Sequence, residues 1–157
     1  RHPERFDEVA LLCEKNDFVI ARRSKEEPIN QQCHIWLLDS LGELMSIYAE
    51  ATIVTMGGSF SDIGGHNPLE PALFKKPVIV GPRMDNFGEV FEQLKNERAI
   101  VHLDNGEFSK PLAREVSSLL KNENQARTLG ENAFNVVKRN QGATALSLDN
   151  LSTLLQN

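Results

Sequence analysis

Short apolar runs of strand length alternate with amphipathic segments along the chain as far as Ser109. Runs such as Phe18–Ala21 and Val78–Val80 contain no polar residue at all. A strand without polar and apolar alternation is buried on both faces, as the strands of a parallel sheet are. The pattern therefore predicts an α/β fold, with a Rossmann-like parallel sheet and helices on both of its faces.

The individual elements follow from the same periodicity. The predicted strands are Phe18–Ala21, Cys33–Leu38, Thr52–Met56, Val78–Val80 and a short one around Ile100 and Val101. The predicted helices begin near Phe6, Ser40, Asn67 and Asn86, and after Ser109 only helical periodicity remains. We expect residues 1–157 to form a single domain with a helical C-terminal tail.

Composition excludes several classes of function. The chain is 40% hydrophobic and 25% charged, as in ordinary globular domains. Its formal net charge of -5 and the lack of a Lys/Arg cluster argue against nucleic-acid binding. No apolar run reaches the ~20 residues that span a bilayer. Cys13 and Cys33 lack CxxC spacing, which favours reduced core thiols of a cytosolic protein.

The first candidate site is Gly57-Gly58-Ser59, directly after a predicted strand. Ligands bind at the carboxyl ends of strands in open parallel sheets. Paired glycines allow close approach of a ligand, and successive N–H groups can cradle a phosphate. A tight turn needs the same glycines, so both interpretations remain open. No GxGxxG follows a strand, which excludes the dinucleotide fingerprint.

The second candidate is the segment from Gly64 to Pro71, with Asn67 at the N-cap of a helix and Glu70 at N3. The Asn67/Glu70 pair could serve only as a capping box. Pro71, however, lacks the N–H of a regular first turn, and the glycines leave the helix N-terminus open to an anion. A carboxylate here can also accept hydrogen bonds from two adjacent sugar hydroxyls. His66 lies among these glycines and is a further candidate.

A third turn, Ser40 to Leu44, contains Glu43, which we interpret from its spacing as part of a capping box. His34 and His102 are predicted to be hydrogen-bonded structural residues. There is no HExxH, no Cys/His cluster and no DxD, so no metal site is predicted. Because the sequence contains no GxSxG elbow, no nucleophilic catalytic triad is predicted.

Five motifs then occur in a recognisable order. They are RHPERF (1–6), LGEL (41–44), GGS (57–59), GGHNPLEPA (64–72) and PVIVGP with NF (77–87). Together they resemble the C-terminal domain of bacterial 3-deoxy-D-manno-octulosonic acid (Kdo) transferases, glycosyltransferases of lipopolysaccharide synthesis with the two-domain GT-B architecture. The resemblance spans about residues 1–103, and GGHNPLEPA is its most specific element.

The resemblance implies that this chain binds the nucleotide sugar CMP-Kdo and that an N-terminal domain, absent from the chain, binds a lipid A precursor. By the same resemblance Arg1 meets the donor phosphate, the turn at Glu43 borders the nucleotide, and Asn67 and Glu70 hold the ribose. The predicted donor-binding residues are Arg1, Gly42, Glu43, Leu44, Gly57, Gly58, Ser59, Gly65, His66, Asn67 and Glu70.

The family also implies what the chain lacks. The general base is expected in the missing N-terminal domain, so the chain contains no catalytic residue and is expected to be inactive alone. No metal or other cofactor is expected. The full-length enzyme is expected on the cytoplasmic face of the bacterial inner membrane.

This sequence departs from the family pattern at two places. Where the family commonly reads GPH, the chain has Gly81-Pro82-Arg83, so no role of that histidine transfers to Arg83. The stretch Phe60–Ile63 is also less typical, because it places Asp62 next to the expected anion site.

Two other functions remain open. One is a GT-B enzyme that uses a UDP-sugar, either a transferase or an epimerase. The other is a non-enzymatic α/β binding module, in which the glycines only make turns and Asn67 and Glu70 only cap a helix.

Overall fold

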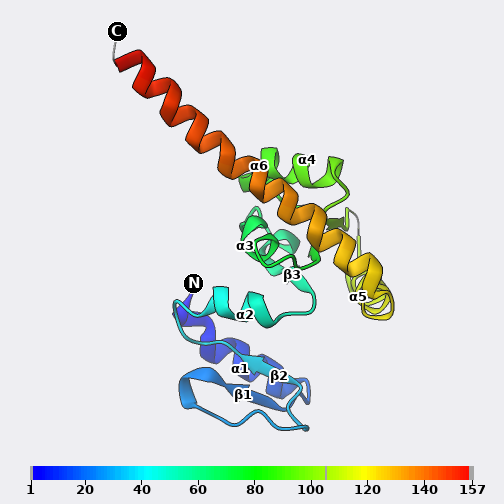
Figure 1. Ribbon diagram of the computed structural model, residues 1–157. Helices are drawn as coiled ribbons and strands as arrows, with labels where there is room; N and C mark the ends of the chain where they lie inside the picture. Colours follow the sequence, from blue (N-terminus) through cyan, green and yellow to red (C-terminus); the bar gives the residue numbers. More distant parts are fainter. Residues whose placement is uncertain (1, 105, 156–157) are drawn as a thin grey trace. The chain divides into compact units, whose positions relative to one another are not determined.

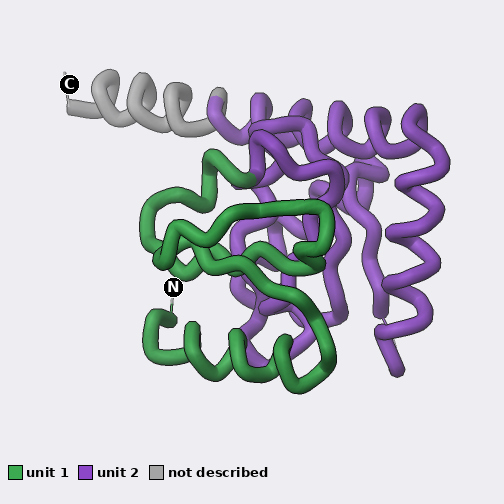
Figure 2. Tube along the Cα trace, turned by 90° about the horizontal axis from the view of Figure 1, so that it is seen from below, with its two compact units in different colours: residues 1–47 green, residues 48–157 purple. Residues whose placement is uncertain are grey.

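The computed structural model describes the backbone of residues 2–104 and 106–155 and the side chains of residues 2–104 and 106–141. The chain divides into two compact units, residues 1–47 and 48–157 (Figure 2). Each unit combines helices with a parallel sheet, so the predicted α/β class is confirmed, although the strands form two sheets and not one. The assignment of residues 1–157 to one domain stays a prediction.

Unit 1 is built around a two-stranded sheet. Its elements are η1 (Pro3–Arg5), α1 (Phe6–Lys15), β1 (Ile20–Arg22), η2 (Arg23–Lys25), β2 (Ile35–Leu37) and the start of α2 (Leu44–Glu50). Strands β1 and β2 are parallel, with Ile20 opposite Ile35. The strand predicted from Phe18 begins two residues later, because the N–H of Val19 donates to Nδ1 of His34 at 3.1 Å and not to a strand carbonyl. His34 is thus a hydrogen-bonded structural residue, as predicted.

A buried carboxylate holds unit 1 together. Asp39 accepts hydrogen bonds from the Ser24 N–H at 2.7 Å, the Ser24 hydroxyl at 2.6 Å and Nε of Arg22 at 2.6 Å. Burial by itself would raise the pKa of Asp39, but these hydrogen bonds outweigh it and hold the pKa well below its ordinary value. The resulting stability is present above the carboxyl's unfolded-state pKa and is lost as the pH falls towards the lower folded-state pKa.

Unit 2 contains the second sheet, whose strands follow the order β3 (Val54–Met56), β4 (Val78–Val80) and β5 (Val101–His102). All are parallel, with Val54 opposite Val78 and Ile79 opposite Val101. The connections contain η3 (Gly57–Phe60), α3 (Leu69–Ala72), η4 (Asp85–Phe87) and α4 (Gly88–Asn96), followed by α5 (Ser109–Lys121) and α6 (Glu123–Leu155) (Figure 1). These are the βαβ units that the alternation predicts.

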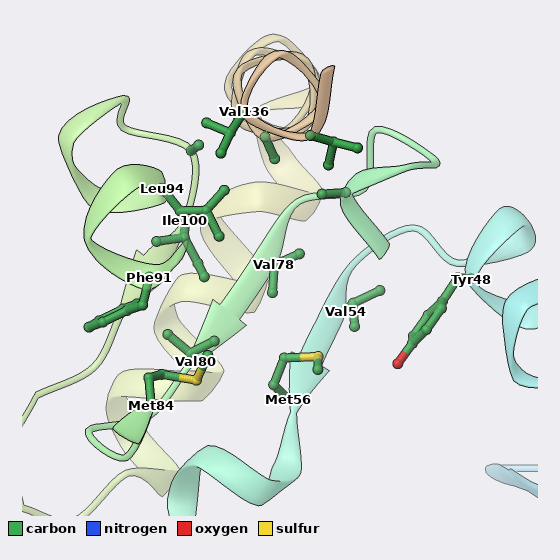
Figure 3. Packing of buried hydrophobic residues seen from close by; sticks show 14 residues of the cluster. Tyr48, Val54, Met56, Val78, Val80, Met84, Phe91, Leu94, Ile100 and Val136 are labelled. Carbon is green, nitrogen blue, oxygen red and sulfur yellow. The ribbon is translucent and has the colours of Figure 1, made fainter. Parts of the chain in front are cut away.

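Helices cover both faces of this sheet. Successive residues of a strand point to opposite faces, and one face packs against α3, α4 and α6 (Figure 3). Members of that cluster include Val54, Met56, Val78, Val80, Leu94 and Val136. On the other face Ile79 packs with Leu103 and with Leu119 of α5. The central strand β4 is therefore buried on both sides, as its unbroken apolar sequence predicts, whereas Thr55 of the edge strand β3 is exposed.

The C-terminal helices belong to this packing. Helix α6 contacts α3, α4 and α5. It approaches the chain after α3 so closely that a Cβ added to Gly130 would lie 1.8 Å from the carbonyl oxygen of Lys75. Among the described residues, no helix has both the length and the apolar character needed to cross a membrane. Cys13 and Cys33 are free and only half-buried, so the prediction that they are core residues is wrong.

Candidate functional site

The loops that leave the carboxyl ends of β3 and β4 are joined through Ser59. This residue is completely buried. Its hydroxyl donates to the Met56 carbonyl at 2.5 Å and accepts from the Gly81 N–H at 2.7 Å, while its carbonyl accepts from the Arg83 N–H at 3.0 Å. These bonds give Ser59 a positioning role: it sets the distance between the two strand ends where a ligand is expected.

Gly58 lies against the imidazole of His66. A Cβ on Gly58 would come within 2.4 Å of Nδ1 of His66, closer than real contacts allow, whereas Gly57 has open space around it. The Gly58 carbonyl also accepts a hydrogen bond from the Gly65 N–H at 3.2 Å. The two glycine pairs of the sequence thus meet, and the absence of a side chain on Gly58 is what lets His66 approach.

Replacing Gly58 with alanine should push the His66 ring away and weaken the binding of the ligand expected at this edge about tenfold, because misplaced groups near a binding site are costly. The matched control is Gly57→Ala, which adds the same methyl group at a neighbouring open position. The His66 ring signals in an NMR spectrum would measure the first effect, and the affinity for CMP, the nucleotide that the family resemblance implies, would measure the second. Equal His66 ring signals and equal CMP affinities in the two variants would show that the close approach of His66 to Gly58 does not affect binding.

The second glycine pair forms a left-handed bend. Gly64 and Gly65 have φ of +81° and +87°, values that favour glycine. The bend is fastened to the loop after β4, since the Gly64 carbonyl accepts from the Asn86 N–H at 3.0 Å and the Ile63 carbonyl accepts from Nδ2 of Asn86 at 2.8 Å. Asn86 was not predicted to belong to this site, because only the tertiary fold brings it there.

The segment after the bend confirms part of the predicted helix start. Oδ1 of Asn67 accepts a hydrogen bond from the Leu69 N–H at 3.1 Å, but α3 begins at Leu69 with Pro68 at its N-cap, one residue later than predicted. Glu70, in the first turn, is half-buried. The helix itself, however, is only four residues long. So few aligned peptide units make a weak dipole, and the predicted attraction of an anion by this helix end is correspondingly weak.

The third predicted turn belongs to unit 1 and differs from its prediction. Helix α2 begins at Leu44, so Ser40 is not its N-cap and the capping box is wrong. Instead, Glu43 accepts from the Ser40 hydroxyl with one oxygen, and from Nε and Nη2 of Arg23 with the other, at 3.1 and 3.0 Å. The bonds from Ser40 and Arg23 lower the pKa of Glu43. Gly42, with φ of +86°, makes the bend that turns the carboxylate towards them.

Arg1, His102 and Arg83 were also singled out in the sequence. Arg1 lies outside the described residues, so its contact with a phosphate stays a prediction. Nε2 of His102 is buried without a hydrogen-bond partner among the described residues, so its predicted hydrogen bond through that nitrogen is not found. Burial lowers the pKa of His102.

Nη2 of Arg83 donates to Oδ1 of Asp62 at 2.5 Å. This ion pair joins the two places where the chain departs from the family pattern.

The candidate residues that the structure describes do not assemble into a metal centre. Within residues 2–104 and 106–155, no group of three or more His, Cys, Asp or Glu side chains is arranged to hold a metal ion. Hydrogen bonds join the loops at the carboxyl edge of unit 2, which carry the carboxylate of Glu70, the amide of Asn67 and the imidazole of His66, all half-buried. Such groups suit the hydroxyls and the ring edges of a polar small molecule.

Two curated proteins are similar to the chain along nearly all of its length. It is 40% identical over 156 residues to the 3-deoxy-D-manno-octulosonic acid transferase of Haemophilus influenzae, covering 99% of this chain and 36% of that protein. It is 32% identical over 143 residues to the enzyme of the same name from Rickettsia prowazekii, covering 90% of this chain and 30% of that protein. The chain thus spans about a third of the length of these relatives. No protein-family model matches it.

One solved structure is similar in both sequence and fold. It is the crystal structure of the C-terminal CMP-Kdo binding domain of WaaA from Acinetobacter baumannii. The TM-score is 0.81 and the identity 33%, and the match covers 87% of this chain and 70% of the other.

Proposed function

Since the chain belongs to the 3-deoxy-D-manno-octulosonic acid (Kdo) transferase family, we propose that it is the donor-binding part of a glycosyltransferase. The enzyme moves Kdo from CMP-Kdo to a lipid A precursor in lipopolysaccharide biosynthesis. The observation that carries this proposal is the similarity to a solved CMP-Kdo binding domain, which extends over 87% of the chain at 33% identity.

The carboxyl edge of unit 2 supplies the donor-binding groups. Glu70 accepts hydrogen bonds from the two ribose hydroxyls, and Asn67 holds the turn that presents it. Ser59 and the glycines at 58, 64 and 65 fix the loops, so that little ordering is needed when the donor binds. Gly57, which is exposed, leaves the backbone open to the nucleotide. Within unit 1, Arg23 and Ser40 hold the carboxylate of Glu43, and the contact of the turn Gly42-Glu43-Leu44 with the nucleotide stays a prediction.

The reaction breaks the bond between the anomeric carbon of Kdo and the phosphate oxygen of CMP. An acceptor hydroxyl forms the new bond, and a general base outside this chain takes its proton. Residues of this chain hold CMP as it leaves, so the chain by itself binds the donor but does not transfer the sugar. The transfer uses no metal, and it takes place on the cytoplasmic face of the inner membrane.

Discrimination between nucleotides tests the proposal. CMP should bind at least about tenfold more tightly than UMP, because a site that hydrogen-bonds one base edge leaves groups unpaired with the other. Isothermal titration calorimetry of the protein with CMP, UMP and UDP measures this difference. Preference for the uridine nucleotides would instead support a UDP-sugar enzyme, and no binding of any of them at millimolar concentration would support a non-enzymatic module.

A further inference from the structure

The donor-binding edge of unit 2 needs a positive charge that its helix cannot supply. CMP-Kdo carries a phosphate and a sugar-acid carboxylate, both anionic at neutral pH. Helix α3 is a single turn, and its dipole is too small to balance these charges. A side-chain cation near the strand ends would supply this charge, in addition to the phosphate contact that the family resemblance implies for Arg1.

Arg83 is the one Lys or Arg in the loops that follow the strands of unit 2. The loop sequences 57–68, 81–87 and 103–108 contain no other, and they also contain several acidic residues, Asp62, Asp85, Asp104 and Glu107. Within these loops, an anionic donor thus meets several acidic side chains and one cationic side chain, Arg83.

The backbone of Arg83 is fixed at the site. Its N–H donates to the carbonyl of the buried Ser59 at 3.0 Å, and its own carbonyl lies 3.0 Å from where a Cβ on Gly65 would be. The side chain of Arg83 therefore leaves the backbone directly beside the loops that contain Gly58 and Gly65. Only its side chain is free to change partner.

The ion pair that the Arg83 side chain makes with Asp62 is exposed, so another anion can replace Asp62. Nη2 of Arg83 donates to Asp62 at 2.5 Å, but the two side chains are 51% and 94% exposed. Water screens such a pair, so it contributes little to stability. A phosphate or carboxylate that accepts two parallel hydrogen bonds from the guanidinium binds it more strongly than one exposed aspartate oxygen does.

We propose that Arg83 is the anion-binding residue of the donor site in unit 2, and that Asp62 occupies its guanidinium when no donor is bound. This inference rests on the proposed function. It makes Arg83 a specificity-determining residue, which favours a nucleotide-linked sugar acid over cytidine. The phosphate and the sugar carboxylate present the same chemistry, and the choice of ligand separates them.

The test compares three variants of the protein by calorimetry with cytidine, CMP and CMP-Kdo. Arg83→Gln should bind CMP-Kdo about tenfold or more weakly and cytidine unchanged, because a charged hydrogen-bond donor is lost. Asp62→Asn should bind CMP-Kdo roughly two- to fivefold more tightly, because an exposed competing charge is removed. Arg139→Gln is the matched control, since Arg139 is also exposed and paired, with Glu97 at 2.9 Å, and should change nothing.

The pattern of losses identifies the anion. If Arg83→Gln weakens the binding of CMP as much as that of CMP-Kdo, the guanidinium binds the phosphate. If the substitution weakens only the binding of CMP-Kdo, the guanidinium binds the sugar carboxylate. Wild-type affinity of Arg83→Gln for all three ligands would overturn the inference and leave the proposed function standing. Equal weakening by Arg83→Gln and Asp62→Asn would also overturn it, because it would make the pair a structural clamp. A wild-type protein that binds neither CMP nor CMP-Kdo would refute the proposed function, and this inference with it.

Discussion

Replacing Glu70 with glutamine should weaken CMP binding by about tenfold to a hundredfold. The carboxylate of Glu70 is half-buried in the first turn of α3 and, in the proposed site, accepts hydrogen bonds from two ribose hydroxyls. Hydrogen bonds to a charged group contribute about 1.5–3 kcal/mol, and each 1.4 kcal/mol is about a factor of ten in affinity. Calorimetric titration with CMP measures the loss.

A purely structural role of Glu70 makes a different prediction. Glutamine completes a helix start as glutamate does, so a purely structural role predicts little change in the free energy of unfolding and unchanged binding of CMP. The matched control is Glu89→Gln, because Glu89 is also an acidic residue in the first turn of a helix, α4, and is exposed. Binding by Glu70→Gln that equals that of Glu89→Gln would reduce Glu70 to a capping residue.

Replacing Gly130 with alanine should lower the free energy of unfolding of unit 2 by about 2 kcal/mol. The added Cβ would lie 1.8 Å from the carbonyl oxygen of Lys75, so either α6 or the chain after α3 must move. Overpacking against backbone costs about 3 kcal/mol. The higher helix propensity of alanine returns about 1 kcal/mol, so the steric cost dominates.

Urea unfolding followed by circular dichroism measures this change. Gly88→Ala is the control, because Gly88 begins α4 with nothing near its missing Cβ, and it should leave the stability unchanged or slightly higher. A Gly130→Ala protein as stable as the Gly88→Ala protein would mean that α6 does not pack against Lys75 as described.

Features of the fold that depend on local pattern were predictable from the sequence. Strand β4 was predicted at its observed bounds, because Val78–Val80 is buried on all sides and is followed by Gly81-Pro82. The bend at Gly64 and Gly65 and the hydrogen bond from the Leu69 N–H to the Asn67 side chain were also predictable, since positive φ and Asx turns depend mainly on residue type.

Features of the fold that depend on residues distant in the sequence were not predictable. Ser40 and Glu43 have the spacing of a capping box, but Arg23, twenty residues away in the sequence, binds the carboxylate and the helix starts later. The pairing of Arg83 with Asp62 and the anchoring of the Gly64 bend by Asn86 likewise join separate loops. Such contacts follow from the strand order, which no local spacing reveals.

Residue-resolved titration of the protein with CMP tests the central claim most directly. The backbone amide signals of the segment from Gly57 to Glu70 should shift in an NMR spectrum on addition of CMP and much less on addition of UMP, with the N–H of Arg83 among those that move. Shifts confined to other parts of unit 2, or no shift with CMP at millimolar concentration, would contradict the assignment of this edge as the donor site.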